Sequence, residues 1–366
     1  MEDPLKILPE EVCEIIFSNL KKDDIMQASL VSKHWYRITG RSKECMNKIA
    51  IYHAFLEDNP ETKYILASER LYQHLDFRNY SCKRDTKLIR NLRSIVNKFA
   101  GSLITLRSHV DIVRTSELPK LKELMICCNY YYQHQYCIEK LGLTAKAKCV
   151  KKLKIDCTDL CKTSIKVLQQ KIANLHNLKV LNISDPYLLD GLKSKKFKLE
   201  EFILNYNESL EWIPAYFEFF VTQRSYLKFI DLNMSFKQIA LFMEQFPKLE
   251  TLIVRNEAFD VDEMDQLMYI ENLAYPHNDS ITTFGYYGFI FNGETDNIVA
   301  ILPKLRNLQK LKLNIIDPKL TESIISMTSL KTVEYCDRDD LSFESVTRIE
   351  QNIKLAKCDF VHIRSF

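Results

Sequence analysis

Cysteine and histidine are the side chains in this sequence best suited to bind a metal ion or to act as nucleophile and base. The chain has 11 cysteines and 8 histidines among its 366 residues. The densest group is Cys127, Cys128, His134 and Cys137. Adjacent cysteines in an extended segment point to opposite faces of the strand, so Cys127 and Cys128 do not suit one tetrahedral zinc ion. We therefore expect neither a metal site nor a cofactor.

No other pattern predicts catalysis. A reactive thiol needs a neighbouring base and an activating environment, and no cysteine stands out from the others by its sequence context. Only 7 glycines are present, and neither GxGxxG nor GxxxxGK occurs, which argues against a nucleotide-binding loop. We expect a protein that acts by binding and is not itself an enzyme.

Composition indicates in which cellular compartment the protein acts and which classes of partner it does not bind. The net charge of +3 is too small to indicate nucleic-acid binding. No apolar run approaches the roughly 18 residues of a membrane span, and the first residues, MEDPLKILPEE, do not resemble a signal peptide. Cysteines scattered through apolar runs indicate reduced thiols. We expect a cytoplasmic and/or nuclear protein that binds neither nucleic acid nor membrane.

Three short helices are predicted within residues 8–38. Pro9 suits the first position of the first helix, Asp23 or Asp24 can cap the second, and Ser32 can cap the third. Three short helices cannot bury all the apolar side chains that they carry, so we expect apolar surface to remain for a partner. The first helix has one apolar face, because its apolar side chains recur at spacings of three and four: Val12, Ile15, Ile16 and Leu20.

This stretch resembles the F-box motif. The matching residues are Leu8-Pro9-Glu10-Glu11, Ile16-Phe17-x-x-Leu20, Asp24-Ile25 and Leu30-Val31-Ser32-Lys33-x-Trp35. Ser32 stands where the family often has cysteine, and Ala28 and Ser29 are smaller than is common there. The resemblance implies docking on the Skp-family adaptor of cullin–RING ubiquitin ligases, through Leu8, Pro9, Ile16, Phe17, Leu20, Ile25, Leu30, Val31 and Trp35. The alternative is an ordinary helical hairpin that packs on the rest of the chain.

A short unit with apolar residues at its first, fourth and sixth positions recurs from residue 72 onward. Leu121-x-x-Leu124-x-Ile126 is a clear example, and similar units start at residues 150, 178, 199, 227, 249, 281, 308 and 330. Weaker copies start at residues 72, 103 and 355. The clear starts are 21 to 32 residues apart, close to the period of about 20–29 residues typical of leucine-rich repeats.

Helical periodicity separates these units, at residues 163–174, 236–246, 294–302, 318–327 and 342–353. The alternation of strand and helix predicts an α/β fold, a horseshoe with a parallel sheet on its concave face and helices on its convex face. The whole pattern resembles F-box and leucine-rich-repeat proteins, including divergent insect members. We expect an F-box at residues 4–45, a helical connection at 46–71 and a leucine-rich-repeat solenoid at 72–366.

Strand side chains alternate between faces, so residues between the repeated apolar positions should point out of the concave sheet. The residues that we expect to contact a substrate protein there are Lys152, Lys154, Ile203, Phe229, Ile253, Arg255 and Tyr287. Their mixture of aromatic, aliphatic and cationic side chains is typical of protein-binding hot spots. The alternative is a solvated sheet face with scattered apolar residues.

These expectations combine into one function. The chain is predicted to be the substrate-recognition subunit of an SCF-type E3 ubiquitin ligase, bound to a Skp-family adaptor and a cullin and monomeric within that complex. It would contribute orientation and effective concentration rather than bond-making groups. Two alternatives remain open at this point. One is an adaptor-bound scaffold, and the other is a ligand-sensing repeat protein whose lysines hold an anionic molecule, both without ubiquitination.

Overall fold

A computed structural model describes residues 7–52, 61–77, 86–109, 117–127, 149–157, 160–193, 197–205, 212–256, 273–288, 294–314, 316–336 and 343–358. The chain forms two compact units, Met1–Leu178 and Lys179–Phe366. We call them unit 1 and unit 2. The boundary between them lies within the array of repeats.

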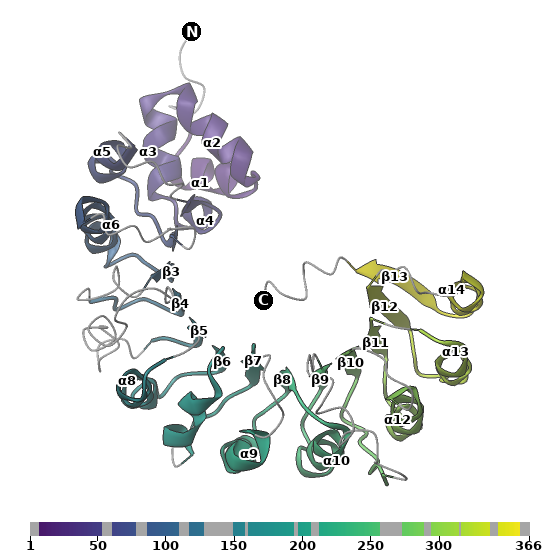
Figure 1. Cartoon of the computed structure of the whole chain (residues 1–366). Helices are drawn as coiled ribbons and strands as arrows, with labels where there is room; N and C mark the ends of the chain where they lie inside the picture. Colours follow the sequence, from purple (N-terminus) through teal and green to yellow (C-terminus); the bar gives the residue numbers. More distant parts are fainter. Residues whose placement is uncertain are drawn as a thin grey trace. The chain divides into compact units, whose positions relative to one another are not determined.

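Unit 1 begins with four short helices (Figure 1). Ser32 caps the third helix as expected, since its Oγ accepts a hydrogen bond of 3.2 Å from the backbone N–H of Trp35. Asp23 and Asp24 lie inside the first turn of the second helix rather than at its cap, where their charge still favours the helix N-terminus. Pro9 is the N-cap of the first helix rather than its first residue. The helices are α1 (Glu10–Ser18), α2 (Lys22–Val31), α3 (Lys33–Arg41) and α4 (Lys43–Asn47).

The four helices enclose a core of their own. The rings of Phe17 and Trp35 meet edge to face, with centroids 5.2 Å apart. Leu20, Trp35 and Tyr72 are partly buried and pack against the core. Its buried members are Cys13, Phe17, Ile25, Ala28, Ile38, Cys45, Met46 and Ile49.

Several contacts attach these helices to the strands of unit 1. The guanidinium of Arg70 stacks on the ring of Tyr36 at 4.4 Å, and Arg70 is only 5% exposed. Gly40 makes room for it, because a Cβ there would lie 2.8 Å from Cγ of Arg70. Tyr72 packs on the helical core and also meets the ring of Phe99 edge to face at 5.2 Å. The helices and the first strands are therefore packed together rather than joined by a free linker.

The described strands of unit 1 pair in chain order and all in parallel. Leu75, Leu106, Leu124 and Leu153 align across them, which is the register that the repeated fourth position predicts. The sheet starts earlier than expected, because residues 46–71 contain a strand as well as a helix. The elements are β1 (Ala50–Tyr52), α5 (Glu61–Ala67), β2 (His74–Asp76), α6 (Thr86–Phe99), β3 (Thr105–His109), β4 (Glu123–Cys127), β5 (Lys152–Asp156) and α8 (Lys162–Ala173).

Unit 2 continues the same alternation of strand and connection. Its strands also pair in chain order and in parallel, with Phe202, Ile230, Leu252, Phe284 and Leu311 in one row. The elements are β6 (Val180–Ile183), η3 (Pro186–Leu192), β7 (Glu201–Leu204), α9 (Trp212–Gln223), β8 (Phe229–Asn233), α10 (Phe236–Gln245), β9 (Thr251–Asn256), β10 (Thr283–Gly288), α12 (Glu294–Ile301), η4 (Leu302–Lys304), β11 (Lys310–Leu313), α13 (Pro318–Ile325), β12 (Thr332–Cys336), α14 (Phe343–Glu350) and β13 (Lys354–Cys358).

The last repeat differs from the sequence-based expectation by three residues. Leu355 pairs with Val333, which holds the fourth position of the preceding unit. The final unit therefore starts at residue 352 rather than 355. Its first position is the polar Asn352, so the apolar pattern alone pointed to the wrong register.

Local signals set the connections of unit 2. Pro318 is the first residue of α13 as predicted, and the side chain of Asp317 caps that helix by accepting a hydrogen bond of 2.7 Å from the N–H of Leu320. Ser235 and Gln238 form a reciprocal capping box at the start of α10. All five predicted helices are present within one to three residues of the expected ends, whereas α6 and α9 were not predicted.

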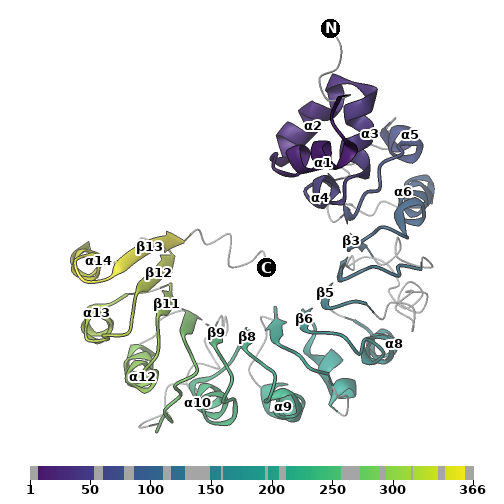
Figure 2. The ribbon, with the colours of Figure 1, turned by 180° about the vertical axis from the view of Figure 1, so that it is seen from behind.

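The helices of unit 2 lie on one side of its sheet. Figures 1 and 2 show α9, α10, α12, α13 and α14 along the outer side and the strands along the inner side. An aromatic cluster fills the layer between them, with Phe220 within 5.0 Å of Phe202 and 5.5 Å of Phe242, ring centroid to centroid. No helix among the described residues covers the opposite face of the sheet, which we call the uncovered face.

Replacing Phe242 with alanine should lower the free energy of unfolding by about 3–5 kcal/mol, because this fully buried ring touches several others in the cluster and leaves a cavity behind. Urea denaturation followed by circular dichroism measures the change. Tyr226→Ala is the control: that ring is 41% exposed, and its loss should change the value by about 0.5 kcal/mol or less. A loss below about 1 kcal/mol for Phe242→Ala would contradict the packing described.

Candidate functional site

Helices α1 and α2 expose apolar side chains that their own core does not use. On α1, Val12, Ile15 and Ile16 form a solvent-exposed stripe beside the buried Cys13 and Phe17. Because 3.6 residues make a turn, one short helix can present two apolar stripes to different neighbours. We call the whole set the helical patch, which consists of Ile7, Leu8, Val12, Ile15, Ile16, Met26, Leu30 and Val31.

The nine residues expected to contact an adaptor separate into two groups. Leu8, Pro9, Ile16, Leu30 and Val31 are exposed, with Leu30 reaching 79%. Phe17 and Ile25 lie inside the helical core, and Leu20 and Trp35 are half-buried against it. The first group is available to a partner in the isolated chain. The second group shapes the surface from inside, and the sequence pattern does not distinguish the two roles.

The seven residues expected to contact a substrate lie on strands of both units. Lys152 and Lys154 lie on β5 in unit 1, with Lys152 exposed and Lys154 half-buried. The other five lie on neighbouring strands of unit 2, in the register that the repeats predict: Ile203 on β7, Phe229 on β8, Ile253 and Arg255 on β9, and Tyr287 on β10.

The expected apolar strip of unit 2 is mostly closed to solvent. Ile253 is 4% exposed, because its side chain leans over Gly285 of the next strand, where a Cβ would come within 2.6 Å of Ile253 Cδ1. Ile203 and Tyr287 are buried as well, and Phe229 is half-buried. The uncovered face therefore offers less apolar contact area than the sequence indicates.

Arg255 is held by Asp231, which precedes it by one strand. Its Nε and Nη2 donate hydrogen bonds of 2.7 Å each to the two carboxylate oxygens of Asp231. Burial raises the pKa of Asp231, and the charges of Arg255 and Lys312 oppose that rise. A buried pair of this kind fixes both side chains, and leaving one charge without the other is costly.

A second ion-pair group lies further along the same face. Lys310 and Lys312 share the carboxylate of Glu334, one to each oxygen. Burial alone would raise the pKa of Glu334, but the hydrogen bond from Lys310 and the charge of Lys312 outweigh it and lower the pKa. In unit 1, Arg107 similarly contacts Glu123 at 3.1 Å and Asp76 at 3.8 Å. These charged side chains are therefore paired within the fold.

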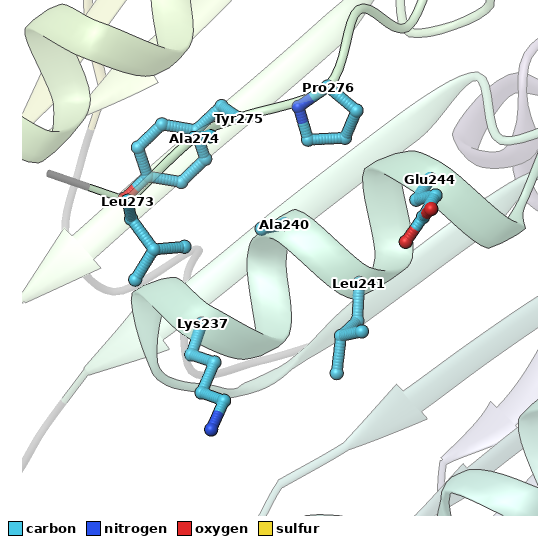
Figure 3. Close-up of a pocket in the computed structure, with 8 residues that line it drawn as sticks. All are labelled: Lys237, Ala240, Leu241, Glu244, Leu273, Ala274, Tyr275 and Pro276. Carbon is cyan, nitrogen blue, oxygen red and sulfur yellow. The ribbon is translucent and has the colours of Figure 1, made fainter.

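The helix side of unit 2 carries a groove that no sequence pattern predicts. It has a volume of about 660 Å³, with α10 as one wall and the segment Leu273–Pro276 as the other (Figure 3). Its lining is mainly apolar, and the charged side chains of Lys237 and Glu244 stand at α10. The hydroxyl of Tyr275 donates a hydrogen bond of 2.8 Å to Asn297, which fixes the second wall. The two walls come from different repeats, so no local sequence pattern brings them together.

The cysteines differ in state. Cys13, Cys45, Cys127, Cys149 and Cys161 are free thiols, whereas Cys157 is disulfide-bonded, in contrast with the expectation of reduced cysteines. Within the described parts of the chain, no group of three or more His, Cys, Asp or Glu side chains is arranged to hold a metal ion. Cys128, His134 and Cys137 of the densest sequence cluster lie outside the described residues. No described helix is long and apolar enough to cross a membrane.

Comparison with known families identifies the N-terminal helices. Residues 5–44 match the F-box-like family, which covers α1, α2, α3 and the start of α4. F-box domains typically bind Skp-family adaptors. A search with the chain among curated proteins finds no match. The protein thus combines an F-box-like helical region with a parallel α/β array of repeated strand and helix units.

Replacing Arg255 with leucine should lower the free energy of unfolding at pH 7 by about 3–5 kcal/mol, because the carboxylate of Asp231 remains buried without its partner. A carboxyl group whose pKa is raised in the folded state favours folding as pH falls through that pKa. The deficit of the variant should therefore shrink between pH 7 and pH 5. Urea denaturation at both pH values measures it.

Lys228→Leu is the matched control, since it removes a pair with Glu250 that is exposed on both sides. Its effect should be small at both pH values. A deficit for Arg255→Leu that is equally small, or that grows as pH falls, would contradict the buried pair.

Proposed function

We propose that this protein is the substrate-recognition subunit of an SCF-type E3 ubiquitin ligase. The observation that carries the proposal is the F-box-like match at residues 5–44 together with the helical patch. Apolar side chains exposed on short helices are typical of a surface that a partner covers. The adaptor would cover Leu8, Ile16, Leu30 and Val31, while the core around Phe17 keeps α1 in place.

The repeats supply the other half of the proposal. We infer that they form a leucine-rich-repeat array whose uncovered sheet face binds the substrate protein, as repeat proteins commonly use such faces. The packing of Arg70 and Tyr72 against the helices fixes the first strands relative to the adaptor surface. A rigid connection of this kind is what a receptor needs to present substrate lysines to an E2 bound through the cullin.

In this mechanism the chain is not an enzyme. It holds two proteins near each other, and the rate of ubiquitin transfer rises with the effective concentration of the acceptor lysine. In this proposal ubiquitin transfer takes place in the cytoplasm and/or nucleus, with one copy of the chain in each complex. The chain needs no cofactor of its own for this role.

The double variant Ile16→Glu, Leu30→Glu should lose binding to a Skp-family adaptor, because each substitution places a charge where the partner must exclude water. We expect at least about 100-fold weaker binding, since two central contacts are lost. Titration calorimetry with purified adaptor measures the affinity, and co-purification then tests for the cullin. Both side chains are exposed, so circular dichroism and thermal stability should not change.

Leu71→Glu is the control, because Leu71 is also an exposed apolar residue but lies outside residues 5–44. It should bind the adaptor like wild type. If wild type binds no adaptor, or if the double variant binds equally well, the ligase assignment is wrong. Binding of adaptor without cullin would identify a scaffold instead of a ligase subunit.

A further inference from the structure

Three asparagines occupy equivalent positions at the ends of strands in unit 2, and hydrogen bonds between described residues hold two of them. Asn205 donates a bond of 3.1 Å from Nδ2 to Oδ1 of Asn182. Asn314 bonds to both the C=O and the N–H of Gly288, at 2.6 Å and 3.3 Å. The third is Asn233, whose Oδ1 has no hydrogen-bond partner in the part of the chain that the structure describes.

Asn233 belongs to the uncovered face. It pairs in register with Arg255, and Leu232 beside it points to the helix side and is fully buried. Asp231, two residues earlier on the same face, holds Arg255 through two hydrogen bonds. The unpaired Oδ1 of Asn233 therefore belongs to a residue whose register partner is a guanidinium that is fixed in position and 14% exposed.

A buried amide oxygen without a hydrogen-bond partner costs free energy, so an unpaired one on a binding face calls for a donor group of a ligand. A carboxamide carries one acceptor and one donor group, as a peptide unit does, and its natural complement is the main chain of another segment. The neighbouring pair of Asp231 and Arg255 carries no net charge. The unpaired Oδ1 of Asn233 is an acceptor, so it favours a peptide N–H over an ionised carboxylate or phosphate, which only accept hydrogen bonds.

We propose that Asn233 is the anchor at which the uncovered face of unit 2 binds an extended segment of a substrate protein through its main chain. The peptide N–H donates to Oδ1 of Asn233, and the guanidinium of Arg255 lies beside the peptide carbonyl. Phe229, half-buried on the same strand, contacts a side chain of the segment. Since Asn233 is only 3% exposed, binding includes a small rearrangement of side chains at the strand end, which is common at interfaces.

This inference rests on the proposed receptor function, because it states how the substrate is held. It differs from the sequence-based expectation in its chemistry. The buried Ile203, Ile253 and Tyr287 leave little apolar area on this face, so recognition depends on hydrogen bonds to the peptide backbone.

The test uses the full-length protein and a phage-displayed library of random peptides about twelve residues long, which span about 40 Å when extended. Peptides selected on wild type are synthesised and their affinities are measured for wild type and for Asn233→Leu. We expect Asn233→Leu to bind about tenfold more weakly or worse. Lys237→Ala, on the helix side, should bind like wild type.

N-methylation of each peptide bond then tests for main-chain recognition. Methylation at one position should weaken binding to wild type about tenfold. The same methylation should cause no further loss with Asn233→Leu, because the two changes remove the same hydrogen bond. Independent, multiplying effects would overturn the proposal, as would equal binding of all selected peptides to wild type and Asn233→Leu, or selection of no peptide.

The melting temperature distinguishes two cases for Asn233: an Oδ1 without any partner, and an Oδ1 that accepts a hydrogen bond from a buried water. Asn233→Leu should keep the melting temperature within about 1 °C of wild type, whereas Asn314→Leu should lower it by about 3 °C or more, because it breaks two bonds to Gly288. A drop for Asn233→Leu as large as that for Asn314→Leu assigns Asn233 to the fold and overturns the proposal. Adaptor binding by wild type is measured in parallel, so failure of the peptide site and failure of the ligase assignment give different results.

Discussion

The register of the parallel strands is the constraint on which the other features of this protein depend. Parallel pairing aligns the fourth apolar residue of each unit, as in the row Ile230, Leu252, Phe284 and Leu311. A slip of one residue would turn every such side chain to the opposite face. The same alignment places Asp231 beside Arg255 and Lys310 beside Glu334, so the charged pairs of the uncovered face follow from the packing of the helix side.

The helical region, α1 to α4, buries only part of its apolar side chains. Short helices have too few residues to bury every apolar side chain against one another, and α1 carries two apolar stripes. One stripe, with Cys13 and Phe17, closes the core, while the other, with Val12, Ile15 and Ile16, remains in solvent. A region of this kind has a buried core yet keeps an apolar surface for association. The F-box-like match gives that surface a class of partner.

The two binding surfaces that we propose differ in chemistry. The helical patch is apolar, so an adaptor would be bound chiefly by exclusion of water. The uncovered face of unit 2 has its aliphatic side chains closed and its charges paired, which leaves hydrogen bonding as the means of recognition. Apolar contact at the helical patch favours a lasting association with the adaptor. Hydrogen bonds on the uncovered face form only with a segment that has the right geometry. A receptor that stays on its adaptor and exchanges substrates needs both properties.

The sequence alone determined the alternation of strand and helix and the five helices that it predicted, because these depend on local signals, but not β1, α6 or α9. Helical and strand periodicity, the cap at Ser32 and the start at Pro318 each act within a few residues, and so does the F-box pattern. Only the tertiary structure decided which apolar residues are available. Phe17 and Ile16 are neighbours in one motif, yet Phe17 lies in the core and Ile16 on the surface. Ile253 is buried because its side chain packs over Gly285 of the next strand, which has no side chain of its own. The start of the sheet at β1, the register of Leu355 and the bond between Asp231 and Arg255 likewise depend on pairing between separate repeats. Burial and pairing are set by neighbours distant in the chain, and a periodic pattern does not contain that information.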